Sequence, residues 1–261
     1  MSPNKSGYAP VNGLKMYYEM YGSGKPLVLI HGGGSTIQSN WDKVIPLLAP
    51  ARQVIAVEMQ AHGRTEDIDR NFTFEQDADD IAALLNYLNL TKADIFGFSN
   101  GGQIALQVAI RHPKVVSKIV VASIGYTREG FHPQFWDVMS RATFDTMPPL
   151  LKDAFLKVNP DPEKLLKMFH RDAIRMNAFT SWEDDAIKSI TSPAFIITGD
   201  NDVVTTEHAV QMQRFIAGSR LAIFPGGHGE YLGELTTGNN DTKLHETFIA
   251  MVNSFLDGTL K

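Results

Sequence analysis

Cysteine is absent from the 261 residues of this chain. A chain without cysteine cannot form a disulfide framework, a thiolate zinc site or a cysteine nucleophile. The sequence also lacks an apolar run long enough to cross a bilayer, and its N-terminus lacks the apolar core of a signal peptide. We therefore predict a soluble, cytoplasmic protein with no membrane partner, and we interpret its Asn-X-Thr triplets as chance matches to the glycosylation pattern.

A block of basic residues is also missing. The formal net charge is -5, from 24 Lys and Arg against 29 Asp and Glu that are spread along the chain. Because nucleic-acid binding needs a basic patch, we predict a small-molecule substrate and no nucleic-acid partner. The composition leaves a homodimer open. Hydrophobic residues make up 43% of the chain, which is enough for the core of an α/β domain.

Short apolar segments predict a sheet of about eight strands. Apolar and polar residues alternate over residues 14–20 after Asn12-Gly13, which is typical of the second strand of a hairpin. The other segments are nearly continuous apolar runs, typical of strands buried on both faces of a parallel sheet. They are residues 26–30, 54–57, 94–96, 118–122, 194–198 and 221–224.

Helical patterns alternate with these strands. Thr73 and Gln76 have the spacing of a capping box before an apolar helical face. A second helix is expected over residues 102–111 and ends at Pro113. This alternation predicts an α/β fold, with a mostly parallel twisted sheet flanked by helices on both faces.

A long stretch without a strand pattern separates the strands that end near Ala122 and begin near Ala194. It is rich in Phe, Trp and Met, and closely spaced prolines divide it into short helices. We predict an α/β core made of residues 1–125 and 191–261. Residues 126–190 are predicted to form a helical cap insertion on the edge of the sheet.

Ser99 lies in the segment FGFSNGG, residues 96–102, where sheet formers give way to helix formers. The surrounding pattern is G-x-S-x-G, which places a serine at a sharp strand-to-helix turn. Gly97 and Gly101 would avoid clashes with the adjoining strand and helix, and the helix N-terminus favours developing negative charge. We predict that Ser99 is a nucleophile, which requires a base.

The base and the acid are predicted from chain order, since such serines are followed first by the acid and then by the histidine. His228, in a glycine-rich loop after the last strand, is preferred to His208 and His245, which fall in expected helices. Asp202 is preferred to Asp200, which more typically caps a turn, and residues 123–125 offer no carboxylate. Asp202 would hold His228 in the tautomer that accepts the serine proton.

A glycine run, HGGGS at residues 31–35, follows the strand at residues 26–30. Backbone amides contact a substrate oxygen only where no side chain intervenes. We expect the amide of Gly33, with Gly34 as a second candidate, to form an oxyanion hole with the amide of Asn100. His31 is expected to be a structural hydrogen-bonding residue.

These parts resemble the α/β-hydrolase superfamily over almost the whole chain. The resemblance is carried by LVLIHGGGS, FGFSNGGQIALQVAIRHP, IITGDNDVV and IFPGGHGE. It implies an α/β-hydrolase fold with a helical cap and a serine hydrolase that uses Ser99, His228 and Asp202 as a catalytic triad. Residues 59–65 resemble the G-H-G-R-S loop of the family and are expected to be structural. Residues 233–242 add a polar loop that departs from the family pattern.

The expected activity is hydrolysis of a carboxylic ester of a small, largely apolar substrate through an acyl-enzyme, as in a serine esterase. Phe98, Trp136, Met139 and Met147 are the predicted substrate contacts, although the insertion would also need such residues to pack on the sheet. Flexible methionines would permit a loose substrate range.

Two other readings remain open. The same triad could serve a C–C hydrolase, lactonase, aminopeptidase, perhydrolase or hydroxynitrile lyase, or the chain could be a ligand-binding or signalling protein with a slow, vestigial triad.

No cofactor and no metal are expected. Residues 22–25 suggest a phosphate loop, but Pro26 replaces the required hydroxyl residue. His245 and Glu246 begin like a zinc-protease motif, but Ile249 stands where the second histidine is needed.

Overall fold

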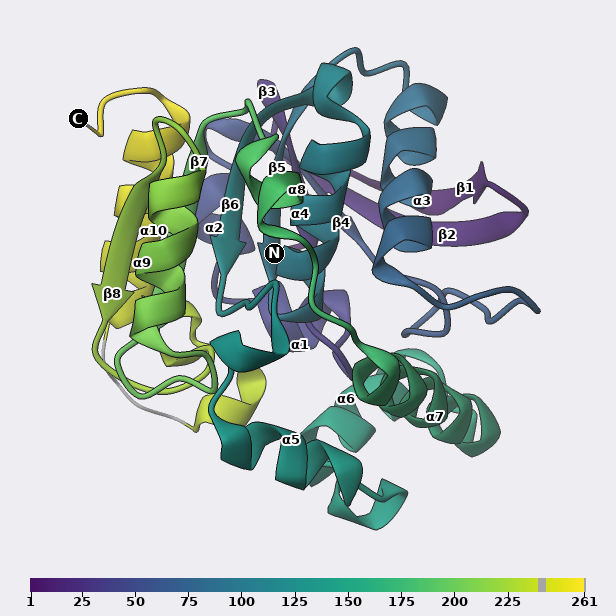
Figure 1. Ribbon diagram of the computed structural model, residues 1–261. Helices are drawn as coiled ribbons and strands as arrows, with labels where there is room; N and C mark the ends of the chain where they lie inside the picture. The colour runs from purple at the N-terminus through teal and green to yellow at the C-terminus, as the bar shows by residue number, and fades with distance from the viewer. Residues whose placement is uncertain (239–242, 261) are drawn as a thin grey trace.

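A computed structural model describes residues 1–238 and 243–260 of the chain. The fold begins with an antiparallel hairpin (Figure 1). Strands β1 (Lys5–Val11) and β2 (Leu14–Tyr21) are joined by Asn12 and Gly13. Both turn residues have positive φ, 47° and 86°. This backbone twist suits a two-residue hairpin loop, so the predicted turn is confirmed.

The hairpin continues into one eight-stranded sheet in the order β1-β2-β4-β3-β5-β6-β7-β8. Strand β2 also pairs with β4 in the antiparallel sense, and all pairs from β4 through β8 are parallel. The predicted, mostly parallel sheet is therefore confirmed. Its other strands are β3 (Lys25–Ile30), β4 (Arg52–Val57), β5 (Ala93–Phe98), β6 (Val116–Ala122), β7 (Ala194–Gly199) and β8 (Arg220–Phe224).

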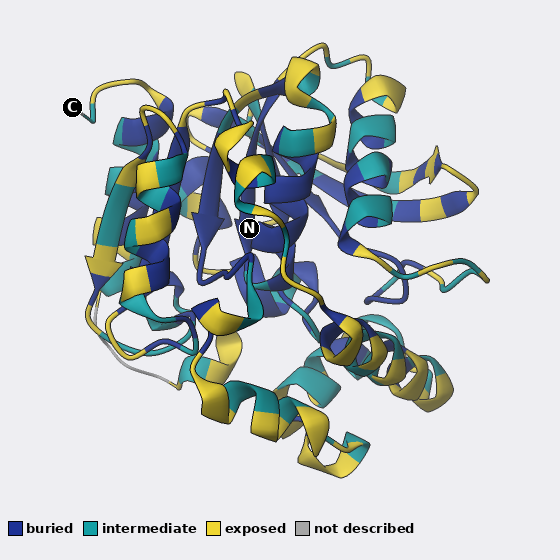
Figure 2. Ribbon diagram, in the orientation of Figure 1, coloured by how far each residue is buried: buried dark blue, intermediate teal, exposed yellow. Residues whose placement is uncertain are grey.

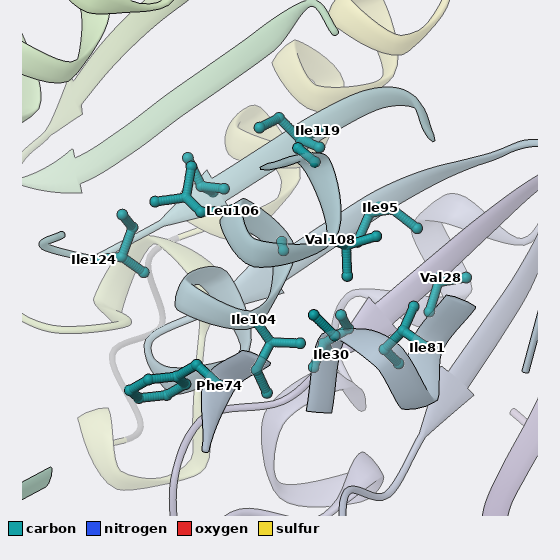
Figure 3. Close-up of a cluster of buried hydrophobic side chains, with 14 of the residues drawn as sticks. Val28, Ile30, Phe74, Ile81, Ile95, Ile104, Leu106, Val108, Ile119 and Ile124 are labelled. Atoms are coloured by element: carbon teal, nitrogen blue, oxygen red, sulfur yellow. The ribbon is translucent and has the colours of Figure 1, made fainter. Parts of the chain in front are cut away.

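Helices cover both faces of the sheet (Figure 1). One face carries α3 (Phe74–Tyr87), α4 (Asn100–Arg111), α8 (Asp184–Lys188) and α9 (Thr206–Phe215). The other face carries α1 (Ile37–Trp41), α2 (Ile45–Leu48) and α10 (Leu244–Leu256). Figure 3 shows Ile81 of α3 and Ile104 of α4 packed near Ile30 and Ile95 of the central strands. Short 3-10 turns occur at η1 (Pro113–Val115), η4 (Glu230–Leu232) and η5 (Leu235–Thr237).

Helix α3 begins at the predicted cap, although the capping box is incomplete. The Thr73 hydroxyl accepts a hydrogen bond from the amide of Gln76 at 3.1 Å. The Gln76 side chain donates to Asp80 instead of returning to Thr73. Asp80 is buried on the same helix and is paired with Arg70, and its contact with Gln76 directs that side chain along α3.

Strand β8 differs from the expectation that every apolar run is buried on both faces. It is the last strand of the sheet, and Ile223 is 45% exposed. Figure 2 shows β8 in the colours of partial and full exposure, whereas the central strands are buried. The prediction was wrong here because the flanking helices leave the faces of this edge strand partly exposed.

The segment between β6 and β7 is helical, as expected, and most of it lies beyond the carboxyl ends of the strands (Figure 1). It contains η2 (Arg128–Gly130), α5 (Pro133–Ser140), η3 (Phe144–Thr146), α6 (Pro149–Val158) and α7 (Pro162–Ala178). We call α5, α6 and α7 the insertion helices. Helix α8 packs instead on α4 and α9, beside the sheet. The division of the chain at residues 126 and 190 stays a prediction.

Among the described residues, no helix combines the length and the apolar character that a membrane span requires.

The buried contacts between α3 and the sheet generate a stability prediction. Ile81 is 0% exposed and Ile174, on α7, is 66% exposed. Ile81→Ala should lower the free energy of unfolding by about 2–5 kcal/mol, because it removes packed methylenes and leaves a cavity. Ile174→Ala should change it by less than about 0.5 kcal/mol. Urea unfolding followed by circular dichroism measures both values, and equal effects would contradict the packing described here.

Candidate active site

Ser99 stands at the sharp turn between β5 and α4, with φ 53° and ψ -125°. The neighbouring glycines leave no room for side chains. A Cβ at Gly97 would lie 1.9 Å from the carbonyl oxygen of Gly101, and a Cβ at Gly101 would lie 2.0 Å from that of Ile30. The close approach of β3, β5 and α4 therefore requires glycine at both positions and holds Ser99 in a sparsely populated conformation.

Ser99 begins a hydrogen-bonded chain of three side chains that come from distant segments. Its Oγ lies 3.1 Å from Nε2 of His228. Nδ1 of His228 lies 2.7 Å from Oδ1 of Asp202. Since the carboxylate accepts a hydrogen bond from Nδ1–H, the tautomer of neutral His228 leaves Nε2 free to accept the serine proton. The structure thus brings together the three residues predicted as a triad.

The alternative residues have other partners. Oδ1 of Asp200 accepts a hydrogen bond from the amide of Gly226 at 2.8 Å, and this bond closes a turn. Nε2 of His208 accepts a hydrogen bond from the amide of Tyr126 at 3.1 Å, and burial lowers the pKa of His208 to about 4. His245 lies in α10. None of these three residues lines the cavity in front of Ser99.

Asp202 is held by more donors than the sequence indicated. Ser123 Oγ donates to Asp202 Oδ2, and the hydroxyl of Tyr231 lies 2.6 Å from Ser123 Oγ. The amides of Gly199 and Val203 donate at 3.3 Å and 2.7 Å. Burial raises the pKa of Asp202, but the imidazole of His228 and these donors outweigh burial and lower the pKa to about 2.

Ser123 was missed as a site residue because it is an isolated serine in the sequence. The signal that could have found it is positional, since it follows β6, which pairs with β5 in the sheet. Carboxyl ends of neighbouring parallel strands meet at one edge of the sheet. Ser123 has positive φ, 56°, which marks a second tight turn at that edge.

Gly33 and Asn100 line the same cavity as Ser99. In the part of the chain that the structure describes, neither residue's backbone amide has a protein acceptor. A Cβ at Gly33 would lie 2.5 Å from Nδ2 of Asn100, so the two residues are close neighbours. They follow the adjacent strands β3 and β5, and this arrangement suits an oxyanion hole.

Gly34 does not fit the same role. Its amide donates to Oδ2 of Asp172 at 2.7 Å. The amide is therefore already paired by a side chain of α7, and the prediction of Gly34 as a second oxyanion donor was wrong.

The loop at residues 59–65 contacts Asp172 through the side chain of His62. Nδ1 of His62 donates to the carbonyl of Gln60 at 2.9 Å, and Nε2 donates to Asp172 at 2.9 Å. Burial alone lowers the pKa of His62, but the Asp172 carboxylate outweighs burial and raises it. His62 thus joins the loop to α7 as an ion pair. His31 is buried and accepts a hydrogen bond from the amide of Met59 at 3.1 Å. It therefore has the structural hydrogen bonding that was expected.

A cavity of about 400 Å³ lies between Ser99 and the insertion helices. This volume suits a small-molecule ligand. Its insertion wall is mainly apolar and includes Phe131, Phe135, Met139, Met147, Met168 and Met176. None of residues 233–238 lines it, and residues 239–242 of the predicted polar loop lie outside the described residues.

Two of the four predicted substrate contacts, Met139 and Met147, line this cavity, and two do not. Phe98 is 4% exposed and packs against the ring of His228, with 4.8 Å between the ring centroids. Trp136 lies under the guanidinium of Arg128 at 3.7 Å and donates to the carbonyl of that residue. These two side chains support the walls, so their prediction as substrate contacts was wrong.

In residues 1–238 and 243–260, no group of three or more His, Cys, Asp or Glu side chains is arranged to hold a metal ion.

The sheet order and the serine at the β5–α4 turn define an α/β hydrolase. The family model described as the alpha/beta hydrolase fold matches residues 25–159. The chain belongs to this family, and it is a hydrolase.

Curated relatives and solved structures agree with this assignment. A 2-hydroxymuconate semialdehyde hydrolase from Pseudomonas sp. (strain CF600) is 41% identical over 103 residues, which cover 38% of this chain and 36% of that protein. A 2-hydroxy-6-oxo-2,4-heptadienoate hydrolase from Pseudomonas putida is 28% identical over 257 residues, 90% of each chain. An esterase from Exiguobacterium antarcticum is similar in structure, with a TM-score of 0.76 and 25% identity over 97% of this chain and 100% of that one.

The low pKa of Asp202 generates a prediction about stability and pH. The contribution of a carboxylate with a lowered pKa is complete above its unfolded value of about 3.9 and is lost as the pH falls toward about 2. The free energy of unfolding of the wild type should therefore exceed that of Asp202→Asn by a smaller amount as the pH falls through this range. Urea unfolding between about pH 6 and pH 3 measures the difference, and a difference that is independent of pH would contradict the assignment.

Proposed function

We propose that the chain is a carboxylic-ester hydrolase that forms an acyl-enzyme on Ser99. The hydrogen-bonded chain from Asp202 through His228 to Ser99 carries this proposal. It ends at a cavity that is also lined by two residues whose backbone amides have no protein acceptor in the described part of the chain. Nucleophile, base, orienting acid and oxyanion donors are the parts that acyl transfer to water requires.

The reaction begins when His228 Nε2 takes the proton of Ser99 as Oγ attacks the ester carbonyl carbon. Negative charge moves to the carbonyl oxygen, which the amides of Gly33 and Asn100 stabilise. His228 then gives the proton to the leaving alcohol, and the acyl group remains on Ser99. A water molecule repeats the sequence, loses its proton to His228 and releases the carboxylic acid.

Asp202 contributes by staying ionised. Its pKa of about 2 keeps the carboxylate negative while His228 accepts and returns the serine proton. The negative charge stabilises the imidazolium that forms when Ser99 attacks. Ser123 and the amide of Gly199 hold the second carboxylate oxygen, so that the first is aimed at His228.

A carbon–carbon hydrolase is the second candidate, and the names of the two Pseudomonas relatives favour it. The solved structure of an esterase favours the first candidate. The two activities are distinguished by giving the same preparation p-nitrophenyl butyrate and 2-hydroxy-6-oxo-2,4-heptadienoate. Ester turnover that exceeds cleavage of the dienoate supports the proposal, and the reverse order supports the second candidate.

Removing the nucleophile should abolish turnover. Ser99→Ala should lower kcat for p-nitrophenyl butyrate by at least about 10⁴-fold, because the attacking oxygen is lost. Ser140→Ala, which alters an exposed serine on α5, should leave kcat unchanged. A fluorophosphonate probe should label the wild type and Ser140→Ala but not Ser99→Ala, as measured by mass spectrometry. Turnover that survives in Ser99→Ala would refute the assignment.

A further inference from the structure

The cavity in front of Ser99 has an unusual charge distribution. Apart from His228, Asp172 is the one ionisable side chain among the described residues that line it. Lysine and arginine are absent from this lining. The charged side chain that a bound molecule meets there is therefore an acid, set in a wall of aromatic, methionine and aliphatic side chains.

Asp172 lies beside the amides that would hold the reacting carbonyl oxygen. Its Oδ2 accepts the amide of Gly34, and a Cβ at Gly33 would lie 3.2 Å from the same oxygen. The Asp172 side chain is 14% exposed. Helix α7 thus delivers a carboxylate to the edge of the glycine loop, where the acyl part of an ester would pass.

The two basic side chains that contact Asp172, Arg175 and His62, do not line the cavity. Arg175 donates to Oδ1 of Asp172 at 2.8 Å and to Asp77 at 2.6 Å, and its guanidinium lies over the rings of Phe72 and Phe74. Its side chain is 4% exposed, and that of His62 is 1% exposed. Both side chains contact Asp172 from the buried side and do not line the cavity, so neither is placed to pair with a ligand.

A carboxylate on the substrate would lose its hydration in this cavity and would form no ion pair with a lysine or arginine of the lining. An ionised carboxylate that is desolvated and left unpaired is strongly disfavoured. It would also lie near the carboxylate of Asp172, and the low dielectric of an apolar cavity strengthens that repulsion. A neutral acyl chain of the same size meets neither penalty and gains apolar contacts.

We propose that the cavity selects esters with an uncharged acyl group and rejects those that carry a carboxylate, with Asp172 as the specificity-determining residue. This inference rests on the proposed ester hydrolysis at Ser99. It separates the chain from its relative named for a dienoate, a carboxylate at neutral pH. It also gives a physical reason to expect that the dienoate is a poor substrate here.

The test uses three esters with acyl chains of similar length: p-nitrophenyl hexanoate, p-nitrophenyl methyl adipate and the p-nitrophenyl half-ester of adipic acid. The first two are neutral, and the methyl adipate controls for the size and polarity of the chain end. For the wild type, kcat/KM for the half-ester should be at least about 10²-fold below that for the methyl adipate.

Asp172→Asn should reduce this ratio by about tenfold at low ionic strength, because it leaves His62 and Arg175 without their shared anion. The ratio is the readout, since Asp172 also holds Gly34 and its loss will slow all three esters. Asp153→Asn, at an exposed position of α6, removes an equal charge outside the cavity and should leave the ratio unchanged.

Val138→Lys provides a second, independent variant should Asp172→Asn fail to fold. Val138 lines the cavity and is 66% exposed, so a lysine there needs no buried space. It should reduce the ratio by about threefold or more, and high salt should weaken the effect.

The outcomes separate the two proposals. Similar kcat/KM for the half-ester and the methyl adipate in the wild type would overturn the charge selection and leave ester hydrolysis intact. A ratio that Asp172→Asn leaves unchanged would overturn the role of Asp172, and a ratio that Val138→Lys leaves unchanged would overturn selection by the charge of the cavity. Failure to hydrolyse any of the three esters would overturn the proposed function itself, together with this inference.

Discussion

The close approach of β3, β5 and α4 is the constraint on which the rest of the site depends. The carbonyl oxygen of Ile30 comes so near to α4 that Gly101 can carry no Cβ, and Gly97 is restricted in the same way. This packing bends the chain sharply at Ser99 and lays the loop after β3 beside it. The positions of Ser99 and of the Gly33 amide are therefore consequences of one steric arrangement.

The opposite side of the site depends on a network of polar groups. Asp202 accepts hydrogen bonds from Ser123 just after β6, from Gly199 of β7 and from His228 after β8, and these donors keep it ionised in a buried place. His228 is held between that carboxylate and Ser99, while Phe98 packs against its ring. A buried carboxylate this well satisfied is rigid, and its rigidity orients the imidazole.

The insertion helices close the cavity and also determine its charge. Helix α7 brings Asp172 to the glycine loop, where it binds the amide of Gly34 and the imidazole of His62. One carboxylate thus joins the insertion to two loops of the sheet edge. Because its basic partners are buried behind it, Asp172 stands without them in the described lining of the cavity, whose insertion wall is mainly apolar.

The sequence by itself determined the strands, the hairpin and the order of the three side chains that meet at the sheet edge, because period and glycine spacing are local properties and because the motifs resemble a known family. Their catalytic roles stay a prediction. Contacts between distant segments were decided only by the tertiary structure. A carboxylate from α7 accepts a hydrogen bond from the amide of Gly34, and Phe98 and Trp136 pack outside the cavity lining. The order of the strands leaves Ile223 on an edge strand. Ser123 joined the site for the same reason, since its partner Asp202 lies 79 residues away along the chain.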